Sequence, residues 1–308
     1  MTGPLAGIKV LDLSRVLAGP WAGQLLGDYG ADVVKVERPG TGDDTRRWGP
    51  PWIGGSSGDA AYFLAANRNK RSIAIDLTND HGRDLVRELA ATADVVIENF
   101  RVGTMHRFGL GAKSLLASNP RLVFCSISAF GQSGSRAAEP GYDAMIQAEG
   151  GLMSITGPSD EDGGSPQKVG VAIADIMAGM YAVTAILAAL EERHRSGRGQ
   201  IIDVPLYDSQ VGWLANQAMN YLIGGRSPVR QGTAHPNLVP YQAFPTRDGH
   251  FVLAVGSDAQ FAACVECLGR PELAVDPRYS DNAARVANRE SLVRLLAAEF
   301  RKQSTEYW

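Results

Sequence analysis

The stretch IKVLDLSRVLAGPWAGQLLGDYGADVVKVE, residues 8–37, places two short apolar strand patterns on either side of a helix pattern. Val, Ile and Leu dominate the runs at 8–13 and 31–37, and WAGQLLGDYG at 21–30 reads as a helix. The same alternation continues in three more strand-like runs and one helical run, at 71–77, 93–100, 121–128 and 81–93. Short β-rich runs separated by helices are typical of a parallel sheet covered on both faces. The predicted fold class is therefore α/β, a Rossmann-like sheet in a large domain.

Polar or loop residues end or follow several of these strands, namely Leu17, Arg38, Asp76 and Asn99. Ligands of open parallel sheets bind beyond the carboxyl ends of the strands. We therefore expect these four positions to lie near one crevice.

A long apolar helix is predicted from Ile173 to His194, ending in basic residues and Gly197. Its uncharged part, Ile176 to Leu190, is shorter than the roughly 20 residues that a bilayer span needs. The helix is expected in a protein core, and GRGQIIDVPLYDS at 197–209 is expected to form a turn and a strand. The amino-terminal residues show no signal-peptide pattern. We therefore expect a soluble, cytoplasmic protein without a membrane partner.

A smaller α+β domain is predicted after a linker-like segment. The hypothesis divides the chain into a large domain at 1–223, a linker at 224–236 and a small domain at 237–308. The small domain is expected to contain a hairpin at 243–256, which turns around Asp248 and Gly249, and helices at about 258–268 and 287–302.

Composition excludes several classes of function. The net charge of -3 gives no electrostatic reason to expect a nucleic-acid partner. Three cysteines, at 125, 264 and 267, argue against a disulfide framework. The five histidines show no metal-binding spacing, and G-x-S-x-G is absent. The loop at 17–23 is not G-x-G-x-x-G, which disfavours a nicotinamide cofactor, although Glu37 could hold a ribose hydroxyl.

Asp175 stands near the start of the long apolar helix, with small neighbours such as Ala174 and Ala178. A carboxylate in a first helical turn is stabilised by the helix dipole, so we expect Asp175 to be ionised even in a partly dry cleft. Spacing alone does not distinguish this role from an ordinary helix-start aspartate. A basic rim near the sheet edge is expected to suit phosphate: Arg38, Arg46, Arg47, Lys70, Arg71, Arg101 and Arg107.

Seven ordered blocks resemble the family III CoA-transferases (the CaiB/BaiF family), which include formyl-CoA transferase, carnitine CoA-transferase and alpha-methylacyl-CoA racemase. The blocks are 7–46, 69–77, 93–103, FGQSG at 130–134, GYDAMIQAEGGLMSITG at 141–157, the segment around Asp175, and 197–208. The stretch at 235–261 also looks like the small domain of this family. The resemblance implies a nucleophilic aspartate at Asp175 and an interlinked homodimer.

The resemblance also implies a set of residues that contact CoA or substrate: Leu17, Ala18, Arg38, Ile75, Asn99, Phe100, Arg101, Arg107, Tyr142 and Asp143. Of these, Arg38 and Arg107 are expected near phosphate groups. CoA or acyl-CoA and a small carboxylic acid would be the substrates, without a permanently bound cofactor.

Tyr142 favours a transferase over a racemase, because the racemases resembled here carry a histidine at this position and a tyrosine is a poor base at neutral pH. The amino-acid sequence of residues 141–157 looks most similar to that of succinyl-CoA–dicarboxylate transferases. A racemase, a CoA-binding protein without turnover and a nicotinamide dehydrogenase stay open as alternatives. No counterpart is found for the glycine-rich loop of some transferases. The resemblance also leads us to expect a segment that continues past the small domain and returns to the large one, and the sequence up to Trp308 does not include it.

Overall fold

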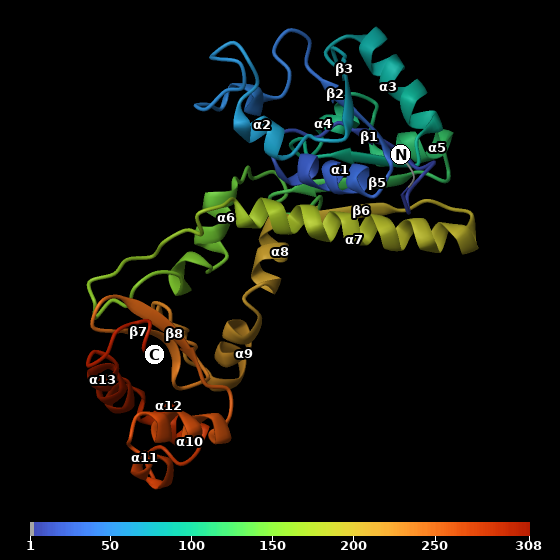
Figure 1. Ribbon diagram of the computed structural model, residues 1–308. Coiled ribbons are helices and arrows are strands. Elements are labelled where there is room, and N and C mark those ends of the chain that lie inside the picture. Colours follow the sequence, from blue (N-terminus) through green and yellow to red (C-terminus); the bar gives the residue numbers. More distant parts are fainter. Residues whose placement is uncertain (1–2) are drawn as a thin grey trace. The chain divides into compact units, whose positions relative to one another are not determined.

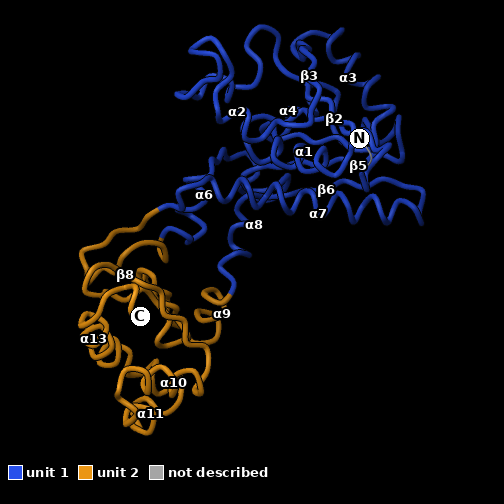
Figure 2. Tube along the Cα trace, in the orientation of Figure 1, with its two compact units in different colours: residues 1–153, 168–215 blue, residues 154–167, 216–308 orange. Residues whose placement is uncertain are grey.

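The computed structural model describes residues 3–308, which fold as two compact units. Unit 1 comprises the residues up to 153 together with 168–215, and unit 2 comprises 154–167 and 216–308 (Figure 2). The boundary expected at 223 stays a prediction of the domain organisation.

Unit 1 contains one six-stranded parallel sheet in the order β3-β2-β1-β4-β5-β6 (Figure 1). The strands are β1 (Lys9–Asp12), β2 (Asp32–Glu37), β3 (Lys70–Ala74), β4 (Val95–Glu98), β5 (Val123–Ser128) and β6 (Ile201–Pro205). This confirms the predicted Rossmann-like α/β fold and all six strand positions. The order reverses between β1 and β4, and such switch points are where open α/β sheets bind ligands.

Side chains alternate between the two faces of the sheet, as the period of a strand requires. In β1, Val10 packs into the cluster formed with α1 (Ala18–Asp28) and α7 (Ile173–Ser196). Its neighbour Leu11 packs into the cluster formed with α3 (Asp80–Thr92), α4 (Thr104–Arg107) and α5 (Ala112–Ser118). Helices therefore cover both faces, which explains why the central strands β1, β4 and β5 are largely apolar.

Shorter elements complete unit 1. They are η1 (Asp44–Arg47), α2 (Ala61–Ala65), α6 (Asp143–Glu149), η2 (Met153–Ile155, shared with unit 2) and α8 (Leu206–Gly212).

The helix α7 is, among residues 3–308, the one helix long and apolar enough to cross a membrane by length and composition. It packs on the sheet instead, with Ala178, Ala182 and Ile186 fully buried. Its far end is fixed by Arg193, whose Nη2 lies 2.9 Å from Asp94 Oδ1 and whose Nη1 donates to the carbonyl of Arg121 at 3.1 Å. The helix stops at Gly197, which has a positive φ of 72°. The predicted core helix and its ending are confirmed.

Unit 2 holds the predicted hairpin, β7 (Tyr241–Pro245) and β8 (His250–Ala254), paired antiparallel. Its helices are α9 (Ala215–Gly224, which begins in unit 1), α10 (Asp258–Cys267), α11 (Glu272–Val275), α12 (Asn282–Ala287) and α13 (Arg289–Phe300). Phe244, Phe261 and Phe300 belong to its own buried core. Cys264 and Cys267 lie on α10 as free thiols.

Candidate active site

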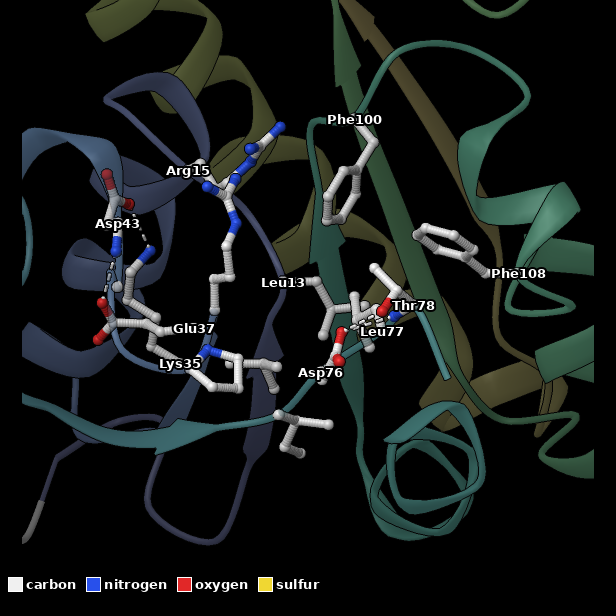
Figure 3. Close-up of a pocket in the computed structure, with 15 residues that line it drawn as sticks. Leu13, Arg15, Lys35, Glu37, Asp43, Asp76, Leu77, Thr78, Phe100 and Phe108 are labelled. Atoms are coloured by element: carbon white, nitrogen blue, oxygen red, sulfur yellow. Dashed lines mark hydrogen bonds and ion pairs between the residues drawn. The ribbon is translucent and has the colours of Figure 1, made fainter. Parts of the chain in front are cut away.

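A cavity of about 410 Å³ lies at the carboxyl edge of the sheet, among the segments that follow β1, β2, β3 and β4. Its lining combines apolar residues with charged ones: Leu13, Ile75, Phe100 and Phe108 among the first, and Lys35, Glu37, Arg38 and Asp43 among the second (Figure 3). Such a lining offers a ligand apolar surface beside charged groups of both signs.

A second hollow of about 290 Å³, here called the groove, is lined by the start of α1, the loop after β4, residues 137–142 and Asp175. Arg15 and Phe100 line both the cavity and the groove. The two hollows therefore adjoin at these side chains, at the switch point of the sheet, and together they are here called the crevice.

The structure brings most of the predicted site residues to this crevice. Those that line the groove are Leu17, Ala18, Asn99, Phe100, Arg101, Tyr142 and Asp175, and those that line the cavity are Arg38, Ile75 and Phe100. The expected proximity of Leu17, Arg38, Asp76 and Asn99 is confirmed, since Asp76 also lines the cavity. Two of the predicted residues, Arg107 and Asp143, line neither hollow.

Arg107 is exposed at the end of α4, where its Nη2 donates to the hydroxyl of Thr104 at 3.1 Å. Asp143 is buried and caps α7 from another segment. Its Oδ1 accepts the backbone N–H of Ala174 at 2.8 Å, and its Oδ2 accepts from Gln147 Nε2 at 2.8 Å. Asp143 therefore acts on the first turn of α7, the turn that carries Asp175.

Asp175 does not have the pKa expected from its place at a helix start. Burial, together with the negative charge of Asp143, raises the pKa of Asp175 to about 7. This raised pKa contradicts the prediction that the carboxylate stays fully ionised, because near neutral pH both its protonated and its ionised forms are populated. The desolvation of a partly closed groove outweighs the favourable first-turn position. A carboxylate held in this way is destabilised relative to one in water.

Gly179, one turn after Asp175, determines how closely α7 approaches α1. A Cβ at Gly179 would lie 2.7 Å from the carbonyl oxygen of Ala18, so only glycine permits this packing. Residues i and i+4 of a helix share a face. The contact at Gly179 therefore directs Asp175 toward Leu17 and Ala18, at the start of α1.

The loop that joins β1 to α1 is held in a strained conformation. Val16, which is β-branched, has a φ of 69° in the left-handed region. The backbone of Arg15 on one side of it is hydrogen-bonded to Asn99, and the Val16 N–H points at the carboxylate of Asp43 at 3.3 Å. These contacts fix where Arg15 and Leu17 lie at the crevice.

The basic rim expected at the sheet edge is only partly present, because Arg46, Lys70 and Arg71 form ion pairs with carboxylates of the same chain. Lys70 is buried and donates to Asp12 at 2.9 Å; burial lowers the pKa of Lys70, against the pull of Asp12. Arg71 binds Asp32 at 2.7 Å. Such pairs cannot be recognised in the sequence, because their members lie far apart along the chain: Lys70 and Asp12 are 58 residues apart.

Glu37, which could have held a ribose hydroxyl, is also occupied. Its carboxylate accepts from Arg46 Nε at 2.7 Å, from Ser72 Oγ at 2.6 Å and from the backbone of Asp43 at 2.8 Å. Burial opposes its charge, but these hydrogen bonds outweigh it and lower the pKa of Glu37 to about 2. Of the expected rim, Arg38 and Arg101 reach the crevice.

Two residues at or near the crevice were missed in the sequence. Arg15 gave no signal beyond its place after β1. The phenol of Tyr62, on α2, is half-buried and packs edge-on against Trp48, with ring centroids 5.3 Å apart. Burial and the negative charges of Asp175 and Asp143 raise the pKa of Tyr62, so its hydroxyl is electrostatically coupled to the groove.

Comparison with known proteins identifies the family. A family model described as CoA-transferase family III matches residues 5–308. The chain belongs to CoA-transferase family III. The resemblance inferred from the sequence is thereby confirmed, and the protein is a transferase that takes an acyl-CoA as substrate.

Relatives with curated functions support this assignment. The succinate–glutarate CoA-transferase of Agrobacterium fabrum is 53% identical over 299 residues, which are 96% of this chain and 74% of that protein. The succinyl-CoA:glutarate CoA-transferase of Mus musculus is 48% identical over 305 residues, 99% of this chain and 69% of that protein. A crystal structure of a CaiB/BaiF family protein from Brucella suis has a TM-score of 0.84 at 53% identity and covers 99% of this chain and 80% of that one.

The sequence blocks that carry the family III resemblance meet at the crevice in unit 1. The block at 7–46 supplies β1, α1 and β2, and the block at 93–103 supplies β4 and the loop with Asn99 and Phe100. The block at 141–157 supplies Asp143, which contacts the first turn of α7. Residues distant in the family III chain are thus neighbours around the groove.

Proposed function

We propose that this protein transfers CoA from an acyl-CoA, with succinyl-CoA the first candidate, to a carboxylic or dicarboxylic acid through a covalent intermediate on Asp175. The observation that carries the proposal is the Asp175 carboxylate itself. It lines the groove, burial makes its ionised form costly, and it forms no hydrogen bond or ion pair with the residues that the structure describes, 3–308. An ionised carboxylate with little stabilisation is a stronger nucleophile than a solvated one.

The first half of the reaction moves CoA onto the protein. One oxygen of the Asp175 carboxylate attacks the thioester carbonyl carbon, and the carbon–sulfur bond breaks to release CoA thiolate and leave a mixed anhydride. The thiolate then attacks the aspartyl carbonyl, which gives an aspartyl-CoA thioester and frees the donor acid. Covalent catalysis of this kind divides one difficult exchange into easier steps.

The second half reverses these steps with the acceptor. Its carboxylate attacks the aspartyl thioester and displaces the thiolate, and the thiolate then attacks the acceptor's carbonyl in the new anhydride. The acceptor leaves as its CoA thioester and Asp175 is restored as a carboxylate. No proton is gained or lost over the full cycle, because a carboxylate enters and a carboxylate leaves.

Each tetrahedral intermediate carries an oxyanion that needs hydrogen-bond donors. The start of α1 lines the groove at Leu17 and Ala18. Amide groups in a first helical turn have no acceptor within their own helix. We assign the oxyanion to this end of α1, next to Asp175. The exposed hydroxyl of Tyr142 is a second candidate donor at the same groove.

The relatives guide the choice of acids. The names of the Agrobacterium fabrum and Mus musculus proteins specify succinate or succinyl-CoA and glutarate. We propose the same pair for this chain, a four-carbon and a five-carbon dicarboxylate.

Intact-mass spectrometry tests the proposal. The protein is mixed with succinyl-CoA without an acceptor, beside Asp175→Ala and the control Asp84→Ala, which changes an exposed carboxylate on α3. We expect a CoA-sized adduct on the wild type and the control that hydroxylamine removes, and none on Asp175→Ala. An adduct on Asp175→Ala, or none on wild type that still binds CoA, contradicts the role of Asp175. Glutarate should then discharge the adduct as glutaryl-CoA.

A further inference from the structure

Arg136 directly precedes the segment of the groove wall that runs from Ala137 to Tyr142. Glu139 is the carboxylate of that segment, and it lines the groove together with Asp175. Arg136 is not among the residues that line the groove. Its side chain binds Glu139 instead, because Nε at 2.9 Å and Nη2 at 2.7 Å both donate to Oε2. The charge of Arg136 therefore acts on the groove through Glu139.

Two aromatic rings and a second carboxylate fix the position of Arg136. Its guanidinium carbon lies 3.7 Å from the centroid of the Phe130 ring and 5.8 Å from that of Tyr207, within the range of cation–π contacts. Both rings pack against the core of unit 1. The Nη2 of Arg136 also lies 2.6 Å from Oε2 of Glu149, on α6. These contacts keep the guanidinium beside Glu139.

The lining of the groove carries charges of both signs. Its charged residues are Arg15, Arg101, Asp44, Glu139 and Asp175. When all of them are ionised, three carboxylates stand against two guanidinium groups, so the lining by itself has a negative excess. Arg136 offsets the charge of Glu139 from behind the wall, and the excess is then removed.

A dicarboxylic acid brings a second negative charge into this groove. While one of its carboxylates reacts at Asp175, the other is only a few carbon atoms away. A cube with the groove's volume, about 290 Å³, has an edge of about 7 Å, which is shorter than the screening length of about 8–10 Å in salt solution. An ionised Glu139 without its partner would therefore repel the second carboxylate. A monocarboxylic acid of the same length has no second charge to be repelled.

We infer that Arg136 determines the preference of the groove for dicarboxylic over monocarboxylic acids, because it neutralises Glu139. This inference rests on the proposed transfer of CoA at Asp175. Arg136 acts through Glu139 and is a specificity-determining residue rather than a catalytic one. The side chains of Arg136 and Glu139 are 38% and 48% exposed, so water screens the pair and the effect is the modest one of an exposed ion pair.

Transfer to two acids of equal length tests the inference. Pentanoate has the carbon chain of glutarate with one carboxylate fewer. With succinyl-CoA as donor, kcat/KM is measured for both acids, and pentanoate is also measured as a competitive inhibitor against glutarate, which gives its affinity even where its turnover is slow. The variants are Arg136→Gln, Glu139→Gln and the two combined. The control is Arg68→Gln, which changes an exposed arginine that is paired with Asp28 and lines neither hollow.

The preference for glutarate over pentanoate should follow the charge beside the groove. Arg136→Gln should lower the preference about twofold to fivefold, the size of an exposed pair, and Glu139→Gln should raise it. The double variant should return to the wild-type preference, because the uncovered carboxylate is gone. Arg68→Gln should match the wild type. The loss in Arg136→Gln should shrink when KCl is raised from about 0.05 M to about 0.5 M, because salt screens exposed charges.

A purely structural role for Arg136 would give a different result. Arg136→Gln would then weaken transfer to both acids equally, salt would not change the preference, and Glu139→Gln would not restore activity; this outcome overturns the inference. Arg136→Lys keeps the charge and should keep the preference, so a loss as large as that of Arg136→Gln also contradicts it. If the wild type transfers CoA to glutarate while all variants share its preference, only this inference fails. If the wild type transfers CoA to neither acid, the proposed function fails with it.

Discussion

The side chain of Asn99 forms two hydrogen bonds with the backbone of Arg15, one as acceptor and one as donor. Its Oδ1 accepts the Arg15 N–H at 2.8 Å, and its Nδ2 donates to the Arg15 carbonyl at 2.7 Å. Arg15 follows β1 and Asn99 follows β4, the two strands between which the order of the sheet reverses. One amide side chain therefore joins both sides of the crevice and holds the loop that contains the strained Val16.

Replacing Asn99 by Asp should release this loop. A carboxylate can accept the Arg15 N–H, but it cannot donate to the Arg15 carbonyl, and the two oxygens repel. We expect the free energy of unfolding to fall by about 1–3 kcal/mol. The dissociation constant of CoA should rise on the order of tenfold. Calorimetry and urea unfolding measure both quantities, and wild-type CoA affinity in the variant would show that the loop does not need Asn99.

The pKa of Asp175 should set the acid limb of the pH–rate profile. In the proposed mechanism Asp175 must be ionised to attack the thioester, and its pKa is raised to about 7. With succinyl-CoA as the varied substrate, kcat/KM should therefore rise tenfold per pH unit below 7 and level off above it, since kcat/KM reports the free enzyme. A limb centred near pH 4 would show that the carboxylate is ordinary.

Asp143→Asn should move that limb toward lower pH. The variant keeps an oxygen that can accept the Ala174 N–H but removes the negative charge that helps to raise the pKa of Asp175. The profile is compared with that of Asp84→Asn, an exposed aspartate on α3, which should match the wild type. If the acid limb of Asp143→Asn lies at the same pH as that of the wild type, burial alone raises the pKa of Asp175.

Asp175→Asn should be more stable than the wild type at alkaline pH. The folded pKa of Asp175, about 7, exceeds the ordinary value of 3.8, so between these values the folded chain holds a proton that the unfolded chain has lost. The wild type therefore loses stability as pH rises from 4 to 7, and the amide variant does not. The difference should grow to about 2–4 kcal/mol at pH 8, at 1.36 kcal/mol for each pKa unit. Urea unfolding at pH 4 and pH 8 measures it; equal stability at both contradicts the raised pKa.

Gly179→Ala should separate α7 from α1. Its Cβ would lie 2.7 Å from the Ala18 carbonyl, and backbone cannot yield as a flexible side chain does. Overpacking of this kind costs about 1–3 kcal/mol. Adduct formation at Asp175 should also slow. The matched control is Gly212→Ala at the end of α8, where a Cβ meets no atom within 4 Å. Equal stability of both variants would contradict the close packing.

The sheet and the long helix could be predicted because they depend on local pattern. Apolar runs such as those of β1 and β2 are read directly from the chain, and so is the helix from Ile173 to its glycine ending. The place of Asp175 at the groove, by contrast, was expected only from the family resemblance, because its spacing alone does not distinguish it from an ordinary helix-start aspartate.

The electrostatics of the site could not be predicted, because they depend on contacts between distant residues. In the sequence Lys70 resembles a surface charge, but in the structure it is buried and forms an ion pair with Asp12. The pKa of Asp175 depends on Asp143, 32 positions earlier in the sequence. Tyr62 and Arg15 have no motif around them. Their importance comes from what the fold places beside them.

The two ends of α7 are mechanically connected. Arg193, held by Asp94 and the Arg121 carbonyl, lies 18 positions after Asp175 on the same helix. That separation is about 27 Å at 1.5 Å per residue, so a tilt of about 1° at the far end moves the carboxylate by about 0.5 Å. A shift of that size is enough to misalign an attacking oxygen. The pair of Arg193 and Asp94 therefore fixes the far end of the helix that carries Asp175, and we expect substitutions at this pair to change the rate of the proposed reaction without contacting a substrate.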